Sequence, residues 1–157
     1  MSCITELVKS HLGSVLDRVM IEGGGEYRGY EYLVTFTHLG TRCGYVALPP
    51  GHKVNECLDF DDVPVECHGG VTFYGDDHGA KALLSQPCSD KWIGFDCAHC
   101  YDGHDWEKVA EVFGEKAGLS REYLSAMDDF EGVTRKSYGY VVKECQSIID
   151  QLIEKEK

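Results

Sequence analysis

Two short stretches of this chain concentrate side chains that can do chemistry. The segment Trp92–His104 holds two cysteines, two histidines and two aspartates, and it begins with an apolar, strand-like run. Residues of these types can ligate a metal ion, hold a polar ligand or transfer protons. A second stretch, residues 66–70 (Glu-Cys-His-Gly-Gly), also borders a strand-like run. If the two stretches meet in the folded chain, they form one site.

One interpretation of these residues is a zinc site. Cys97 and Cys100 have the Cys-x-x-Cys spacing of a zinc knuckle. Further ligands can come from the set His99, His104, Cys67 and His68. The chain has a single cysteine pair at this spacing, whereas a full zinc knuckle needs four ligands. The alternative is that Cys97 packs into the core at a strand end and that Cys100 has no role.

Two kinds of catalysis also fit these residue types. Cys97 with an imidazole and an aspartate has the parts of a cysteine nucleophile set. Four other residues can bind a divalent ion, activate water and cleave a phosphoester: His68, Asp96, His99 and Asp102. Known hydrolase motifs such as His-Glu-x-x-His are absent from the sequence. Both kinds of catalysis therefore stay open as alternatives.

Binding without chemistry is the fourth interpretation. The segment 68–70 can present backbone N–H groups to an anion, because glycine allows a close approach. Aromatic side chains that can stack on a base are Tyr74, Trp92, Phe95, Tyr101 and Trp106. Arg28 and Arg42 can pair with phosphate. In the alternative, these aromatic residues are core, and Asp96 and His99 only hydrogen-bond the backbone of their own loop.

The elements that must position these residues follow from the hydrophobic pattern. Apolar residues at helical spacing predict an amphipathic helix over residues 3–20, which the glycines 23–25 end. Residues 27–48 predict a β-hairpin with a turn at 38–41, and Pro49-Pro50-Gly51 stops it. An irregular acidic loop follows over 51–64. Two more strands are expected at 71–74 and 91–96.

The last third of the chain has a helical pattern. Asp105 is the expected N-cap of a helix over 106–117, and Ser120 is the expected cap of a short second helix. Thr134 precedes a long helix with an apolar stripe that runs from Val141 to Ile153. The order of elements predicts an α+β fold with a mainly antiparallel sheet of four or five strands, an N-terminal helix and a helical C-terminal third. Residues 1–157 are expected to form a single domain.

Composition excludes several kinds of partner. The formal charge is −12, with 27 acidic against 15 basic residues, which argues against a nucleic-acid duplex and against an anionic membrane surface. The sequence has no apolar run near the roughly 20 residues that cross a bilayer, and the start has no signal-peptide pattern. We therefore expect a cytoplasmic protein whose eight cysteines are thiols, of which Cys3 and Cys145 are small core residues.

Five blocks of the sequence form a recognisable order: residues 45–52, 61–63, 68–73 (His-Gly-Gly-x-Thr-Phe), 92–102 (Trp-x-Gly-Phe-Asp-Cys-Ala-His-x-x-Asp) and 140–145. Together these blocks resemble a family of small proteins that phages and prophages encode. The blocks cover roughly residues 25–152. The family usually has a small residue at the position of Cys100, which weakens the zinc-knuckle interpretation and leaves Cys97 as a packing thiol. The resemblance implies a viral accessory protein that counters bacterial defence.

Together these observations predict a phage counter-defence protein that sequesters a small nucleotide-derived signal without chemistry. The expected binding residues are His68, Gly69, Gly70, Asp96, His99, Tyr101, Asp102, Trp92 and Arg42. The expected partners are this ligand and further copies of the chain, with the C-terminal helix assisting oligomerisation. No cofactor is expected, and zinc on Cys97, Cys100 and His104 is the weaker alternative. Two other functions stay open: a hydrolase using His68, Asp96, His99 and Asp102, and an inhibitor whose acidic face (Asp59, Asp61, Asp62) binds a host protein.

Overall fold

The computed structural model describes residues 3–16, 18–75, 91–114, 128–129 and 131–157. The main sheet has the strand order β1-β2-β3-β4-β6-β5, and every neighbouring pair is antiparallel. Its strands are β1 (Val15–Leu16), β2 (Val19–Tyr27), β3 (Tyr30–Thr37), β4 (Arg42–Leu48), β6 (Lys91–Asp96) and β5 (Phe73–Gly75). Since β1 has only two residues, five strands form the body of the sheet, and the expected α+β fold is confirmed.

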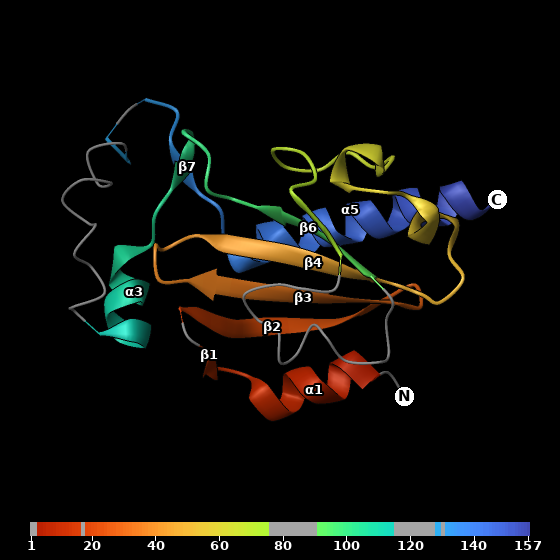
Figure 1. Ribbon diagram of the computed structural model, residues 1–157. Coiled ribbons are helices and arrows are strands. Elements are labelled where there is room, and N and C mark those ends of the chain that lie inside the picture. Colours follow the sequence, from red (N-terminus) through yellow and green to blue (C-terminus); the bar gives the residue numbers. More distant parts are fainter. Residues whose placement is uncertain (1–2, 17, 76–90, 115–127, 130) are drawn as a thin grey trace.

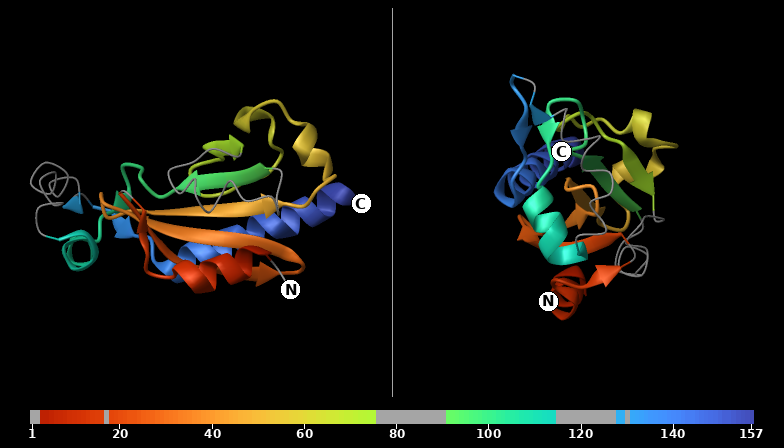
Figure 2. Two further views of the ribbon diagram at one scale, coloured as in Figure 1. Left: turned by 60° about the horizontal axis from the view of Figure 1, so that its bottom comes forward. Right: turned by 90° about the vertical axis from the view of Figure 1, so that its left-hand side faces the viewer.

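Helices cover both faces of this sheet (Figures 1 and 2). Helix α5 (Tyr138–Glu156) lies along one face, where its apolar stripe is buried against β3, β4 and β6. The stripe residues with no exposed surface are Val141, Cys145, Ile148, Ile149 and Leu152. Helix α1 (Cys3–His11) lies on the other face, where Val8 packs against Ile21, Leu33 and Trp92. The C-terminal stripe therefore covers the protein's own sheet, and it is not available as a surface for oligomerisation.

The predicted helix over residues 3–20 is wrong beyond His11. Gly13 follows the helix with a left-handed backbone (φ 77°), which ends an α-helix at little cost because glycine has no Cβ. The chain then enters β1 and β2, and Val15 and Val19 lie in these strands. The apolar residues that were spaced as in one helix therefore lie in a helix and in two strands. Either kind of element can bury one side of an amphipathic segment.

The prediction that glycines 23–25 end a helix is also wrong, because they lie in the middle of β2. A Cβ on Gly24 would lie 2.5 Å from the Tyr32 carbonyl oxygen and 3.1 Å from Val8 of α1. A Cβ on Gly23 would overlap the Tyr138 ring at the start of α5. These glycines therefore allow both helices to approach the strand closely, which is a packing role rather than a hinge.

The predicted β-hairpin is confirmed as β3 and β4, with residues 38–41 as its turn. Tyr27, expected at its start, instead ends β2, and Arg28-Gly29 form a tight turn with positive φ at both residues. The strand predicted at 91–96 is confirmed as β6, and the one predicted at 71–74 is β5, shifted by one to two residues. The acidic loop contains two short 3-10 turns, η1 (Lys53–Glu56) and η2 (Phe60–Asp62).

After β6 the chain forms β7 (Asp102–Gly103), which pairs in parallel with β8 (Thr134–Arg135). Asp105 caps α3 (Trp106–Phe113) as predicted, with its carboxylate accepting from the Lys108 N–H. The short helix expected after Ser120 lies outside the described residues. The long helix begins at Tyr138 with Ser137 as its N-cap, so Thr134 precedes it by one short strand. None of the helices in the described part of the chain is long and apolar enough to cross a membrane.

Candidate functional site

Helix α5 holds the loop that carries His68. The Gln151 side chain accepts from the Glu66 N–H at 2.7 Å and donates to the Glu66 carbonyl oxygen at 2.7 Å. A turn follows in which the Gly70 N–H donates to the Cys67 carbonyl. Cys67 packs against the core under this turn. The loop is therefore fixed at both ends, and His68 projects from it next to the start of α5.

The second loop, residues 97–102, is fixed by its own aspartates. The Asp96 carboxylate accepts from the Ala98 N–H at 3.1 Å and from the Thr72 hydroxyl at 3.1 Å. The Asp102 N–H donates to the His99 carbonyl and closes a turn. These local bonds agree with the alternative that Asp96 stabilises its own loop, and they also hold His99 toward the His68 loop.

Asp102 is the centre of the cluster that joins the two loops. Its Oδ2 accepts from His68 Nε2 at 2.9 Å, from His99 Nδ1 at 2.9 Å and from the His99 backbone N–H at 3.0 Å. Its Oδ1 lies 3.3 Å from the Lys136 ammonium. Only 1% of the Asp102 side chain is exposed, so these partners take the place of water. The two stretches singled out by the sequence therefore meet around one buried carboxylate.

The outer edges of both imidazoles also have partners. His68 Nδ1 lies 2.7 Å from the Tyr140 hydroxyl, in the first turn of α5. His99 Nε2 lies 3.8 Å from Asp96 Oδ1. The His99 ring covers Gly69, where a Cβ would overlap the imidazole. Gly69 therefore has a steric role in the site, while a Cβ on Gly70 would meet no atom within 4 Å.

The cluster sets the ionisation of Asp102. Burial raises the pKa of this carboxyl group, but hydrogen bonds from His68, from the His99 backbone and from the His99 ring outweigh burial and lower the pKa to about 2. Asp102 is therefore a carboxylate at neutral pH. With the carboxylate accepting, His68 donates through Nε2, and its Nδ1 can accept from Tyr140 when the ring is neutral.

This low pKa predicts how acid changes the stability. Because the folded-state pKa of about 2 lies below the ordinary 3.8, Asp102 contributes stability above pH 4, and this contribution is lost as the pH falls toward 2. The loss is about 2 kcal/mol of the free energy of unfolding. Urea unfolding of chelator-treated protein at pH 5, 3 and 2 measures it. The Asp102→Asn variant is the reference, because it lacks only the Asp102 carboxyl group and its remaining carboxyl groups titrate as they do in the native chain. A stability difference between the two proteins that stays constant across this range would contradict the prediction.

The same cluster has the composition of a metal site. His68, His99 and Asp102 each offer one ligand atom, and these three atoms lie within 4.8 Å of one another. Among the described residues, Cys97, Cys100 and His104 belong to no such group. Cys97 is buried in the core beside α5, and burial raises the pKa of its thiol to about 12. His104 binds Asp128 through Nδ1 at 2.7 Å. Because Cys97, Cys100 and His104 do not come together, the geometry does not favour the zinc knuckle. Because the buried Cys97 thiol is protonated, a cysteine nucleophile is not favoured either.

Two of the expected binding residues lie elsewhere. Arg42 is buried and forms a two-pronged ion pair with Glu22 of β2, with nitrogen–oxygen distances of 2.6 and 3.0 Å. Its remaining Nη1 donates to the Lys136 carbonyl, and Lys108 also binds Glu22. Trp92 is buried on the α1 face of the sheet. Neither side chain can therefore contact a ligand at the cluster, whereas Tyr101 is 65% exposed near it.

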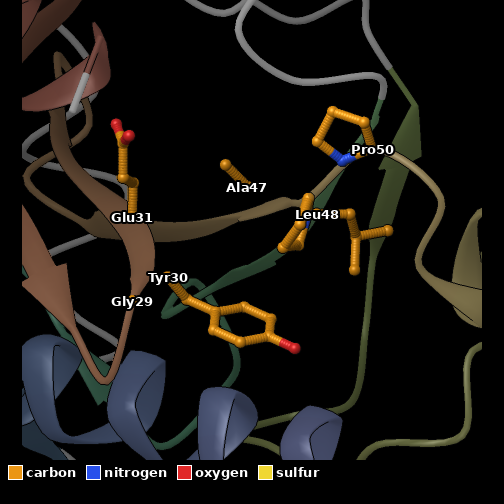
Figure 3. Close-up of a pocket in the computed structure, with 7 residues that line it drawn as sticks. Gly29, Tyr30, Glu31, Ala47, Leu48 and Pro50 are labelled. Carbon is orange, nitrogen blue, oxygen red and sulfur yellow. The ribbon is translucent and has the colours of Figure 1, made fainter. Parts of the chain in front are cut away.

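A pocket of about 270 Å³ adjoins the cluster. Its walls are Cys43, Tyr45, Thr72, Phe73, Phe95 and Asp96. Asp96 lines the pocket and also faces His99, so it connects the hollow to the histidines. Another pocket, of about 180 Å³, lies between the start of β3 and the end of β4, around Tyr30, Leu48 and Pro50 (Figure 3). Because Asp96 pairs with Cys43 at the start of β4, this second pocket is at the opposite end of the strand.

Two residues of the cluster were missed by reasoning from the sequence. Tyr140 stands in the last block of the family resemblance, which was a usable signal, but its helical pattern did not single it out. Nothing in the sequence singled out Lys136, because a lysine that precedes a helix does not differ in pattern from the other lysines of the chain. Comparison with family models, with curated proteins and with solved structures found no match.

Proposed function

We propose that the protein binds a small nucleotide-like ligand, without chemistry, across the pocket beside Asp96 and the His99–Gly69 surface. The observation that carries this proposal is the continuity between an aromatic hollow and a cluster of hydrogen-bonding groups. Asp96 belongs to both, because it lines the hollow and lies 3.8 Å from His99 Nε2. A ligand with a ring at one end and a phosphate at the other fits such a surface.

The hollow suits the ring and the sugar of such a ligand. Tyr45 and Phe73 meet edge to face in its wall, with ring centroids 5.8 Å apart. Its volume of about 270 Å³ is near the lower end of small-molecule pockets, which begin at about 300 Å³. Asp96 and Thr72 at its rim can bind hydroxyl groups. Tyr45 and Phe73 therefore replace Trp92 as the expected aromatic contacts of the ligand.

The exposed loop suits the phosphate. Gly69 and Gly70 both have a left-handed backbone, with φ of 67° and 86°. The Gly70 N–H is taken by the Cys67 carbonyl, which leaves Gly69 as the exposed amide of this pair. The outward edge of His99, 38% exposed as a side chain, lies beside it and donates when both ring nitrogens are protonated. The anion is thus expected over Gly69 rather than over both glycines.

Hydrolysis of the same kind of ligand is the second candidate function, because one observation favours it. Asp102, His68 and Tyr140 form a continuous hydrogen-bonded chain, with distances of 2.9 and 2.7 Å. A carboxylate that holds one ring nitrogen leaves the other in a fixed direction, as general acid–base catalysis requires. In that case Tyr140 joins His68, Asp96, His99 and Asp102 as a catalytic group.

In line with the family resemblance, the proposal is that the protein acts in the cytoplasm of an infected bacterium and sequesters a nucleotide-derived immune signal there. Assembly into a homo-oligomer is part of the proposal. Because the stripe of α5 is buried, the contact between copies must use another surface. The acidic loop around Asp59, Asp61 and Asp62 is exposed, and it supports the third possibility of a protein inhibitor.

The test is a calorimetric titration with cyclic nucleotides and ADP-ribose derivatives, followed by heat release and chromatography of the ligand. Intact recovery supports capture, and a new product supports hydrolysis. Absence of binding to any member of this panel would refute both and favour the inhibitor.

Removal of one histidine should weaken the binding strongly. We expect His99→Ala to reduce affinity about 100-fold, because a lost hydrogen bond to a charged group costs about 1.5–3 kcal/mol. His11→Ala, at the end of α1, is the control and should bind normally, because His11 lies outside both the cluster and the walls of the hollow. Thermal unfolding separates the two interpretations of the cluster. A folded His99→Ala protein with full affinity would contradict the site, and loss of folding would favour a purely structural network.

A further inference from the structure

We propose that His68, His99 and Asp102 bind one divalent transition-metal ion, and that this ion holds the phosphate of the ligand. The second part rests on the proposed function, and the first part does not. The ligand atoms are His68 Nε2, His99 Nδ1 and Asp102 Oδ2, which lie within 4.8 Å of one another. Each nitrogen lies 2.9 Å from the oxygen. Around a tetrahedral ion with bonds of about 2.1 Å, ligand atoms are roughly 3.3 Å apart, so small side-chain shifts suffice.

The groups around the trio match the outer partners of a metal site. A histidine that binds a metal through one nitrogen commonly donates its other N–H to an oxygen, which fixes the tautomer. His68 Nδ1 lies 2.7 Å from the Tyr140 hydroxyl, and His99 Nε2 faces Asp96 Oδ1 at 3.8 Å. Lys136 binds Asp102 through Oδ1, so it leaves Oδ2 for the ion. Both imidazoles therefore direct one nitrogen inward. The other nitrogen of His68 has a hydroxyl partner, and the other nitrogen of His99 has a carboxylate nearby, beyond hydrogen-bond distance.

The charge balance gives an independent reason for a cation. Among the described residues, the imidazoles of the cluster contact two carboxylates, Asp96 and Asp102, and one ammonium, that of Lys136, pairs with Asp102. With neutral imidazoles, an incoming phosphate would meet a negative surface on a chain whose formal charge is −12. A divalent ion on the trio reverses the sign locally and offers the open coordination positions that a phosphate oxygen can occupy.

The ligand set also indicates the class of metal. Two imidazoles and one carboxylate suit zinc or another first-row transition ion, whereas calcium and magnesium prefer oxygen ligands alone. The trio contains no thiol, which distinguishes it from the Cys97-x-x-Cys100 site. Zinc is therefore the probe for the test, and cobalt is the spectroscopic substitute.

The experiment is a titration of chelator-stripped full-length protein with zinc alone, by calorimetry, with the cobalt absorption spectrum as a second measurement. We expect one ion per chain. Asp102→Asn and His68→Ala should bind zinc at least about 100-fold more weakly, and Tyr140→Phe about 10-fold more weakly.

His104→Ala is the matched control, because it removes a histidine that also pairs with an aspartate but lies outside the trio. Cys100→Ser should bind normally. Circular dichroism confirms that each variant is folded, and Asp102→Asn preserves the shape of the side chain.

Each result decides the proposal. Zinc affinity that is lost in the trio variants and kept in His104→Ala supports it. Absence of stoichiometric zinc in the native chain, full zinc affinity in Asp102→Asn, or loss of zinc affinity in Cys100→Ser would overturn it.

Titration of a nucleotide with and without chelator tests the second part. We expect at least a tenfold loss of nucleotide affinity without the metal. Equal nucleotide affinity in chelator would overturn the role of the ion and leave the proposed function intact. Zinc binding without any nucleotide binding would overturn the proposed function, and with it the second part, and would leave the metal site intact.

Discussion

Gly69→Ala is expected to remove nucleotide binding and zinc binding together, while the neighbouring substitution Gly70→Ala leaves both intact. A Cβ on Gly69 would overlap the His99 imidazole, so the ring must leave its place beside Asp102. A Cβ on Gly70 would meet nothing within 4 Å. Loss of one of three metal ligands and of the donor beside the loop should weaken both affinities about 100-fold or more.

The pair is matched because the backbone strain is similar in the two variants. Both glycines have positive φ, at 67° and 86°, so alanine at either position costs about 1 kcal/mol of stability. Chemical denaturation should therefore show this strain cost in both variants, with a further loss in Gly69→Ala because His99 leaves Asp102, and Gly69→Ala alone should lose binding. If Gly69→Ala and Gly70→Ala bind equally well, the His99 ring is not part of the binding surface. Unfolding of Gly69→Ala alone would show that the ring is needed for the fold instead.

Glu22→Gln is expected to be strongly destabilising, with a loss of about 3 kcal/mol in the free energy of unfolding. The Glu22 carboxylate binds both Arg42 and Lys108, and the Glu22 and Arg42 side chains are only 8% and 9% exposed. Without this negative charge, the buried Arg42 guanidinium has lost its counter-ion and has little water to solvate it. Urea unfolding at neutral pH measures the effect.

Glu26→Gln is the control for this prediction. It makes the same chemical change on the same strand, but Glu26 is exposed, so stability should change by less than about 0.5 kcal/mol. Equal stability of the two variants would show that the buried ion pair contributes nothing beyond its desolvation cost. Raised salt should leave the Glu22→Gln effect nearly unchanged, because buried pairs are weakly screened.

The errors in the secondary-structure prediction have two physical origins. The apolar spacing of residues 12–20 suggested one face of a helix, but Leu12 and Val15 are 61% and 45% exposed, so that spacing did not mark buried positions. Gly13 carried the missing information, because a glycine there ends α1 with a left-handed residue. Glycines 23–25 were misjudged for the opposite reason. Their role depends on Val8 and Tyr138, which approach β2 from other elements.

The sequence alone determined the elements with strong local patterns. The hairpin of β3 and β4, the strand β6, the Asp105 cap and the apolar stripe of α5 all follow from alternation, helical spacing or capping chemistry within one short segment. It also determined which residue types could form a site, and the two stretches it singled out do meet at Asp102.

Only the tertiary structure decided which of these residues are partners. Arg42 was expected to bind phosphate, but folding brings it to Glu22; Trp92 was expected to stack on a base, but its position on β6 directs it to the α1 face. Tyr140 and Lys136 join the site because α5 begins beside the His68 loop. The physical reason is distance: local patterns report which side chains are buried, whereas ion pairs and hydrogen bonds act over a few ångströms and depend on how remote segments pack.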